Sequence, residues 1–244
     1  GDVVIHYHGL PITPSTAALK AVSVGHAFVS FRHKDQLNIA VEVCQSFAID
    51  NGAFGAWRSG SPITDWTEFY DWAAVCLAHP SCDFAVIPDV IDGDETANDL
   101  LLMQWPHGVH RGAPVWHMHE SLDRLAWLVN EWPRICIGSS GDYAVVGNEL
   151  WWNRITEALD VVCDEDGFPK CKLHGLRMLN PKVFTKIPFA SADSTNIGRN
   201  VGIDKQWSSG RYLPMTKEAR AQIMRERIEF HNSPSKWTRK EKSC

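Results

Sequence analysis

The stretch Phe84–Asp89 reads FAVIPD, an apolar run that ends in an aspartate. Two further runs have the same form, Phe47–Asp50 (FAID) and Phe189–Asp193 (FASAD). Runs that are apolar at successive positions are typical of parallel strands, because such strands are buried on both faces. The acid that ends each run is then expected at the carboxyl edge of the sheet, where α/β barrels place their active sites.

Eight short apolar runs punctuate the chain, and helical patterns separate most of them. The expected strands are Val3–Tyr7, Ala27–Phe31, Ser46–Asp50, Asp83–Asp89, Ala113–His117, Arg134–Gly138, Cys171–Leu176 and Ile187–Asp193. The expected helices are Asp35–Cys44, Thr64–Ala78, Glu95–Trp105, Ser121–Trp132, Asn148–Cys163 and Lys217–His231, with Thr64 and Ser121 as N-caps and Asn180–Thr185 as a short connection. This alternation predicts a single-domain (β/α)8 TIM barrel over residues 1–231, followed by a flexible tail at 232–244.

A doubly wound open sheet is the alternative architecture for the same alternation. The barrel is favoured because the count reaches eight and because no glycine-rich dinucleotide turn follows the first run, where Gly9–Pro11 reads GLP. In a closed barrel the eighth strand lies beside the first. Asp50, Asp89 and Asp193, which are remote in sequence, would then share one mouth.

Length and composition agree with this class. A chain of 244 residues with 44% hydrophobic content fits one barrel domain. The sequence has no run of eighteen apolar residues and no signal-peptide pattern in residues 1–10, so we expect no membrane span and a cytoplasmic location. Seven cysteines, an odd number with several inside apolar runs, favour reduced and buried thiols over a disulfide framework.

Charge is unevenly distributed along the chain. Residues 1–169 carry 8 Lys and Arg against 23 Asp and Glu, whereas residues 170–244 carry 16 against 6. A basic quarter on an acidic protein is typical of a surface that binds a polyanion. It is equally compatible with a solvated basic helix on the outside of the barrel.

The sharpest local motif is Asp50–Phe54, DNGAF. A carboxylate at a strand end precedes Gly52, which allows the backbone to approach a ligand closely, and Phe54, which can stack on a planar ring. The alternative for the same residues is an Asx turn that leads into a helix.

Asp193 ends the last expected strand, and a carboxylate there can act as a nucleophile towards a sugar carbon. Asp50 would then handle the proton of the leaving group. The alternative for Asp193 is a cap for the following turn. Asp89 can accept hydrogen bonds from the N–H groups of a base, and the small residues Gly138 and Ser139 can offer backbone amides.

In this set of motifs the chain resembles the tRNA-guanine transglycosylases, and more narrowly their phage relatives that insert 7-deazaguanine bases into DNA. The resemblance covers roughly residues 46 to 200 in the family's order. The family's Asp-Ser-Gly-Gly-Phe motif looks like Asp50–Phe54, and its fourth-strand acid looks like Asp89. Its glycine pair after the sixth strand looks like Gly138–Ser139, and its Met-Gly-Val-Gly segment looks like His174–Arg177. Its nucleophile segment looks like Asp193–Asn200.

The resemblance implies exchange of guanine in DNA for a free 7-deazaguanine base of the preQ0/preQ1 type. We expect no cofactor and no metal ligands. Asp193 would form a covalent aspartyl-sugar intermediate, and Asp50 would move protons. The residues that the resemblance implies in base binding are Asp89, Asn51, Phe54, Gly138, Ser139, His117, His174 and Gly175. A phage origin would place the protein in the host cytoplasm, and a homodimer is left open.

Two departures from the family matter. Residues 194–243 contain no cysteine, so the family's zinc lobe is not expected here, and His117–Glu120 replaces the glutamine-containing segment after the fifth strand. Missing tRNA-docking parts and a basic C-terminal region favour DNA, with a flipped-out guanine as the target. The phosphate-contact candidates are Arg199, Lys205, Arg211 and the last helix.

Two rival functions come from other classes. A metal-dependent, amidohydrolase-like hydrolase would use the His6–His8 pattern, HYH, with His117 and Asp193 as further ligands. The sixth strand ends in glycine and serine rather than histidine, and no lysine ends the fourth, which counts against it. A non-catalytic binding module is the other rival, and the acids at three separate strand ends count against that.

Overall fold

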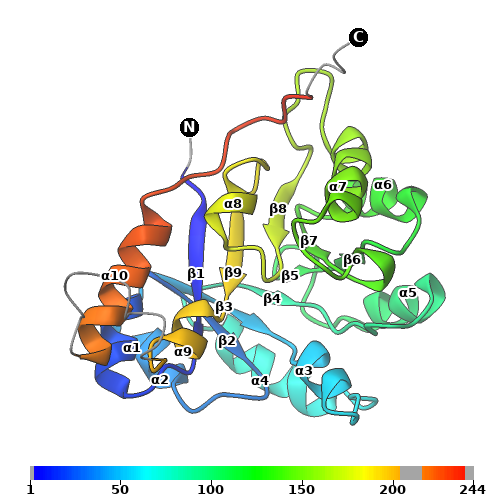
Figure 1. The fold of residues 1–244 in the computed structure, drawn as a ribbon. Helices are drawn as coiled ribbons and strands as arrows, with labels where there is room; N and C mark the ends of the chain where they lie inside the picture. The colour runs from blue at the N-terminus through cyan, green and yellow to red at the C-terminus, as the bar shows by residue number, and fades with distance from the viewer. Residues whose placement is uncertain (1–2, 204–215, 240–244) are drawn as a thin grey trace.

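A ring of parallel strands surrounded by helices forms the molecule in a computed structural model that describes residues 3–203 and 216–239 (Figure 1). The strands follow the order β5-β4-β3-β2-β1-β9-β8-β7-β6. Their bounds are β1 Ile5–Leu10, β2 His26–Ser30, β3 Ser46–Asp50, β4 Cys82–Val86, β5 Gly112–Ala113, β6 Val115–His117, β7 Arg134–Gly138, β8 Lys172–Gly175 and β9 Ser191–Ser194.

The two ends of this strand order belong to one stretch of chain. β5 pairs with β4 and β6 pairs with β7, and only Pro114, which has no N–H to donate, separates β5 from β6. The carbonyl oxygen of Pro114 still accepts a hydrogen bond of 2.8 Å from the amide of Cys136 on β7. The ring therefore closes through a single interrupted strand, and the predicted TIM-barrel fold is confirmed.

The observed strand boundaries match the predicted ones where neighbouring strands pair with the whole apolar run. Ser46–Asp50 and Arg134–Gly138 form strands over the predicted residues. The last strand is shorter than expected, because the Phe189 amide donates to the carbonyl of Ile187 at 2.7 Å in a tight turn, and the strand that pairs with β1 and β8 begins only at Ser191.

The helices cover the outside of the barrel. Their bounds are α1 Ser15–Val22, α2 Leu37–Val43, α3 Ala53–Arg58, α4 Thr67–Leu77, α5 Glu95–Gln104, α6 Leu122–Glu131, α7 Glu149–Val162, α8 Pro181–Phe184, α9 Asn196–Asn200 and α10 Lys217–Glu229, with a 3-10 turn at Gly141–Tyr143. Ser121 caps α6 as predicted, since its hydroxyl accepts from the amide of Arg124 at 3.1 Å. The prediction for Thr64 is wrong, because α4 begins at Thr67 and Asp65 accepts from that amide.

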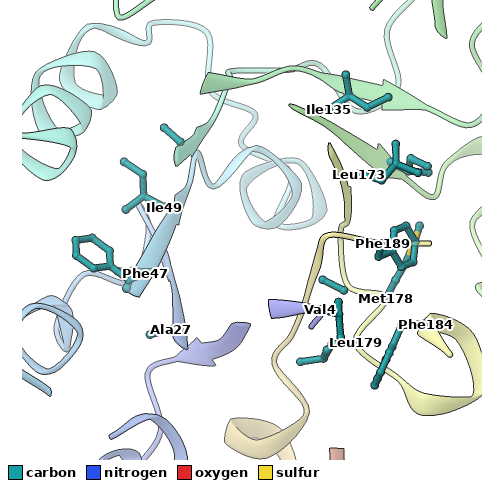
Figure 2. Packing of buried hydrophobic residues seen from close by; sticks show 14 of the residues in the cluster. Val4, Ala27, Phe47, Ile49, Ile135, Leu173, Met178, Leu179, Phe184 and Phe189 are labelled. Carbon is teal, nitrogen blue, oxygen red and sulfur yellow. The ribbon is translucent and has the colours of Figure 1, made fainter. Parts of the chain in front are cut away.

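Alternation along each strand separates two apolar layers. In β3, Phe47 and Ile49 face the helices, whereas Ala48 faces the barrel interior. Figure 2 shows the outer layer, in which Ile135, Leu173 and Phe189 lie among the buried side chains of neighbouring strands and loops. Full burial of such a side chain contributes roughly 1.5–3 kcal/mol, so this layer supplies much of the driving force for closing the barrel.

The segment after α10 crosses the face of the barrel where the strands begin (Figure 1). The amide of Val4 donates to Asn232 Oδ1 at 2.7 Å, the Ser233 hydroxyl donates to the carbonyl of Phe184 at 2.7 Å, and the Trp237 amide donates to Gly167 at 2.8 Å. These contacts differ from the flexible tail expected over 232–239. Residues 240–244 lie outside the described part of the chain.

The six cysteines in the described ranges are free thiols. Cys136, in the barrel interior, shows the effect of its surroundings most clearly, since burial raises the pKa of its thiol well above the usual range. No helix within residues 3–203 and 216–239 is long and apolar enough to cross a membrane.

Candidate active site

The carboxyl ends of the strands surround a pocket of about 200 Å³. This volume is smaller than the roughly 300–1,000 Å³ typical of drug-sized ligands, so the pocket suits a compact group. The structure brings most of the predicted site residues together here. Those that line the pocket are Asp50, Asn51, Phe54, Asp89, His117, Gly138, Ser139 and Asp193.

Three aspartates from β3, β9 and the loop after β4 form the acidic part of the lining. Asp89 and Asp193 are buried, with 8% and 4% of their surface exposed. Burial, together with repulsion from Asp193 and Asp89, raises the pKa of the Asp50 carboxyl to about 7, against the attraction of Arg177. Asp50 can therefore both give and take a proton near neutral pH, which is the property of a general acid and base.

Asp193 is held through one of its two oxygens. Its Oδ1 accepts hydrogen bonds from Nε2 of His174 at 2.9 Å and from the backbone amide of Arg177 at 3.1 Å. Burial lowers the pKa of His174, so the ring is neutral and donates through Nε2–H, while the Ser191 hydroxyl donates to Nδ1 at 2.7 Å. Among the described residues nothing donates to Oδ2, which leaves that oxygen available as a nucleophile.

The alternative role of Asp193 as a turn cap is not what the structure shows. The turn that follows β9 is capped by Ser194, whose Oγ accepts from the amide of Asn196 at 3.0 Å. Asp193 instead projects into the barrel mouth, where it lines the pocket.

Asp89 is the outermost member of a buried chain of alternating charges. Its Oδ2 lies 2.7 Å from Nε2 of His117, and Nδ1 of the same ring lies 3.1 Å from Oε1 of Glu120. Glu120 in turn accepts from Arg124 at 3.0 Å and from the side-chain amide of Asn98 at 3.0 Å. Each buried charge therefore has a partner of opposite sign, which is the condition under which buried ions are tolerated.

His117 is charged within this chain. Burial alone would lower its pKa, but the hydrogen bonds and charges of Asp89 and Glu120 outweigh burial and raise the pKa to about 9. At neutral pH the ring is an imidazolium that donates on both sides. His117 therefore orients Asp89 towards the pocket, and the sequence pattern alone gave no sign of this role.

Asn51 forms the Asx turn that was the alternative for its motif. Its Oδ1 accepts from the amide of Ala53 at 2.8 Å, and its Nδ2 donates to the carbonyl of Ile87 and to Asp89 Oδ1, both at 2.8 Å. Gly52 adopts the left-handed backbone with φ of 79°, which starts α3 without a steric penalty. Both amide protons of Asn51 are thus engaged in holding Asp89 and α3.

Arg177 lines the pocket although the sequence patterns predict no role for it. Its guanidinium lies 3.3 Å from the centroid of the Phe54 ring, and the carboxylates of Asp193, Asp50 and Asp89 stabilise its charge while burial lowers its pKa. Its φ of 55° is unusual for a residue with a side chain and turns its amide towards Asp193. The feature of the sequence that points to this role is a single arginine directly after the expected strand Cys171–Leu176, in a barrel where three other expected strands end in aspartates.

Two residues expected to bind the base do not line the pocket. His174 lies beneath it and contacts Asp193 instead. A Cβ added to Gly175 would lie 2.7 Å from Phe189 Cζ, which shows that this glycine faces the outer apolar layer and allows close packing there. By contrast, Gly138 and Ser139 line the pocket, and Ser139 Oγ accepts from the indole N–H of Trp151 at 2.9 Å.

The His6–His8 pattern of the hydrolase alternative points away from the mouth. Because Tyr7 faces the barrel interior, both histidines face outwards, where His6 Nε2 lies 2.8 Å from the carbonyl of His231 and His8 lies 3.5 Å from Glu229. Within residues 3–203 and 216–239, no group of three His, Cys, Asp or Glu side chains could hold a metal ion.

The candidate phosphate contacts are only partly described. Arg199 is exposed on α9, directly after β9, whereas Lys205 and Arg211 lie outside the described residues. Two arginines of α10 are committed to the fold. Arg220 is buried and donates to the carbonyl of Val201 at 3.3 Å, and Arg225 donates to the carbonyl of Ser23 at 2.8 Å and to Glu229 at 2.7 Å.

Fold and site together define a (β/α)8 barrel with three aspartates at the carboxyl ends of its strands. Comparison with protein-family models and with curated proteins finds no match. A solved structure described as a structural study of a project target from Aquifex aeolicus VF5 is similar, with a TM-score of 0.54 and 11% identity over 95% of this chain and 94% of that one. At this level of identity the similarity concerns the fold.

Proposed function

We propose that this protein is a pentosyltransferase that exchanges guanine in DNA for a free 7-deazaguanine base. The observation that carries the proposal is the difference between two carboxylates of one pocket. Asp193 is fixed by donors on one oxygen, whereas Asp50 has a pKa of about 7. A carboxylate positioned to attack the sugar carbon, beside a second carboxyl that can carry a proton, is the arrangement of retaining enzymes that cleave glycosidic bonds.

The first half of the reaction breaks the bond between guanine and the sugar. Oδ2 of Asp193 attacks C1′ of the flipped-out deoxyguanosine, the C1′–N9 bond breaks with its electron pair going to the base, and protonated Asp50 gives the leaving guanine its proton. The products of this half are neutral guanine, ionised Asp50 and an ester between Asp193 and the sugar.

The second half reverses these steps with a different base. Ionised Asp50 takes the N9 proton from the incoming 7-deazaguanine, N9 attacks C1′, and the ester bond to Asp193 breaks so that the carboxylate is restored. Asp89, oriented by His117 and Asn51, would accept hydrogen bonds from the amino and imino edge of either base. Phe54 offers an aromatic face for stacking.

Two observations favour DNA over tRNA as the proposed substrate, one from the sequence and one from the position of Arg199. Residues 194–243 lack the cysteines of a zinc lobe, and Arg199 lies exposed beside the strand that carries Asp193. A positively charged residue beside the mouth suits the backbone phosphates that flank a target nucleotide.

The test is a base-exchange assay with labelled guanine or a labelled 7-deazaguanine and three acceptors, namely duplex DNA, single-stranded DNA and tRNA. Label that enters DNA but not tRNA supports the proposal in full. Label in tRNA keeps the chemistry and overturns the choice of DNA. No label in any of the three, under conditions in which the protein is folded, overturns the proposed function.

A further inference from the structure

Part of the pocket rim, next to the strand that carries Asp50, carries a positive charge. Arg32 and His33 lie in the loop just after β2 and line the same pocket as Asp50 and Asp193. Strand register pairs Ser30 of β2 with Asp50 of β3, so Arg32 lies beyond Asp50 in the direction of the rim. The pocket therefore has an acidic interior and a basic edge.

Arg32 is held in place by shape rather than by an ion pair. A Cβ added to Gly52 would lie 2.7 Å from Cγ of Arg32, and one added to Gly55 would lie 2.7 Å from its Nη1. The two glycines thus leave room for the arginine side chain to lie against the beginning of α3. Restricting the side chain in this way reduces the entropy that a ligand would have to remove on binding.

The guanidinium of Arg32 is also chemically available. Across residues 3–203 and 216–239 it forms no ion pair and no side-chain hydrogen bond, and Arg177 is the cation that stabilises the Asp50 carboxylate. A guanidinium presents several N–H donors in a fixed planar array, which matches the oxygens of a phosphate.

We infer that Arg32 forms a phosphate subsite at the rim of the pocket, so that the substrate is bound as a nucleotide unit with its base among the acids and its phosphate on Arg32. This inference rests on the proposed function, because the phosphate concerned is the one that flanks the attacked sugar. His33, on the same part of the rim, offers a second donor to the same group. The subsite would distinguish a nucleotide in a strand from a free nucleoside.

The experiment measures the binding of deoxyguanosine, deoxyguanosine 5′-monophosphate, the dinucleotide d(GpT) and 2-deoxyribose 5-phosphate to the full chain. Wild type should bind the monophosphate or the dinucleotide roughly tenfold or more tightly than deoxyguanosine, since hydrogen bonds between charged groups are stronger than those between neutral ones. A preference for the monophosphate alone identifies a terminal phosphate, and a preference for the dinucleotide identifies an internal phosphodiester.

Arg32→Gln should remove this preference, and Arg32→Lys should retain part of it because the positive charge remains. Arg58→Gln is the matched control, since Arg58 ends α3, the helix against which Arg32 lies, carries the same charge and does not line the pocket. Circular dichroism checks that each variant is folded. Equal loss of preference in the Arg58 variant would mean that only general charge attracts the phosphate, which overturns the subsite.

Failure of the subsite and failure of the proposed function give different results. If phosphorylated and unphosphorylated ligands bind wild type equally well while guanine competes with deoxyguanosine, the subsite is wrong and the base site stands. If 2-deoxyribose 5-phosphate binds through Arg32 but guanine does not compete with any ligand, the subsite stands as a phosphate site and the transglycosylase proposal is wrong.

Discussion

The guanidinium of Arg177 lies 3.3 Å from the centroid of the Phe54 ring. The two residues come from the loop after β8 and from α3, on different sides of the barrel mouth. The contact places one positive charge against an aromatic face and near three carboxylates at the same time. Arg177 thus links the stacking surface of the pocket to its acids, and its amide hydrogen bond extends that link to Asp193.

Arg177→Gln should make Asp50 harder to ionise, because Arg177 is the cation that lowers the pKa of that carboxyl. If protonated Asp50 is the acid for the leaving base, exchange activity declines as pH rises through about 7 in wild type. In the variant this decline should move to higher pH. The measurement is the pH profile of kcat/KM, with Arg239→Gln as a control whose profile should match wild type, since Arg239 pairs with Asp160 and does not line the pocket.

Asp193→Asn should abolish base exchange while the fold is kept, because it replaces a nucleophile with an amide of the same shape. We expect a loss of at least about 10³-fold in kcat, together with loss of the covalent protein–DNA adduct on a denaturing gel. Asp92→Asn, at an exposed carboxylate outside the pocket, serves as the control. Wild-type turnover in the Asp193 variant would remove Asp193 from the mechanism.

Asp50→Asn should inactivate the enzyme and stabilise the fold. The pKa of this carboxyl rises from 3.8 to about 7 on folding, so wild type loses stability as pH rises through that window. The variant lacks this loss, and its free energy of unfolding should exceed that of wild type by roughly 1–3 kcal/mol at pH 8. Urea denaturation at pH 4 and pH 8 measures the difference, which should be small at pH 4. A difference of the same size at both pH values would contradict the linkage.

The barrel and its three acids could be predicted because each depends on local pattern. Continuous apolar runs mark strands buried on both faces, and Asp50 and Asp89 follow such runs directly. The positions of strand ends then follow from the topology of a barrel, which brings Asp193 of β9 next to β1. Each of these predictions needs only the order of the apolar runs along the chain and the fact that there are eight of them.

Residues whose roles depend on side-chain direction could not be predicted in this way. Because side chains alternate along β1, Tyr7 points into the barrel and His6 and His8 point outwards. Which residues of β1 point inwards is set by the register of β1 with β2 and β9, not by the sequence of β1 alone. The same limit applies to Arg177, whose position depends on a left-handed backbone at one residue. The prediction that Gly175 binds the base was wrong for a similar reason, since the face of β8 on which it lies is set by the register of β8 with β7 and β9.

His117→Asn should destabilise the protein by roughly 2–4 kcal/mol at pH 7, because it leaves Asp89 and Glu120 without their shared partner. The raised pKa of about 9 means that the contribution of His117 is complete below about 6.5 and is lost as pH rises through about 9. The penalty measured by urea denaturation should therefore shrink above pH 9. His119→Asn is the control, since His119 is exposed and lies outside this chain of charges. A penalty independent of pH would mean that His117 is neutral in the fold.

Arg199→Ala should weaken DNA binding in a salt-dependent way. Each phosphate contact contributes a slope of about 0.9 in the dependence of log Kd on log salt for duplex DNA, so the slope should fall by about that amount. The matched control is Arg239→Ala, because Arg239 is also exposed in the basic C-terminal quarter but pairs with Asp160 in the last turn of α7, away from the residues that line the pocket. Arg220 and Arg225 are unsuitable for this comparison, since their replacement would disturb the packing of α10. Equal effects of the two substitutions would show that DNA responds to net charge, whereas an effect confined to Arg199 would show that DNA approaches the mouth that carries Asp193.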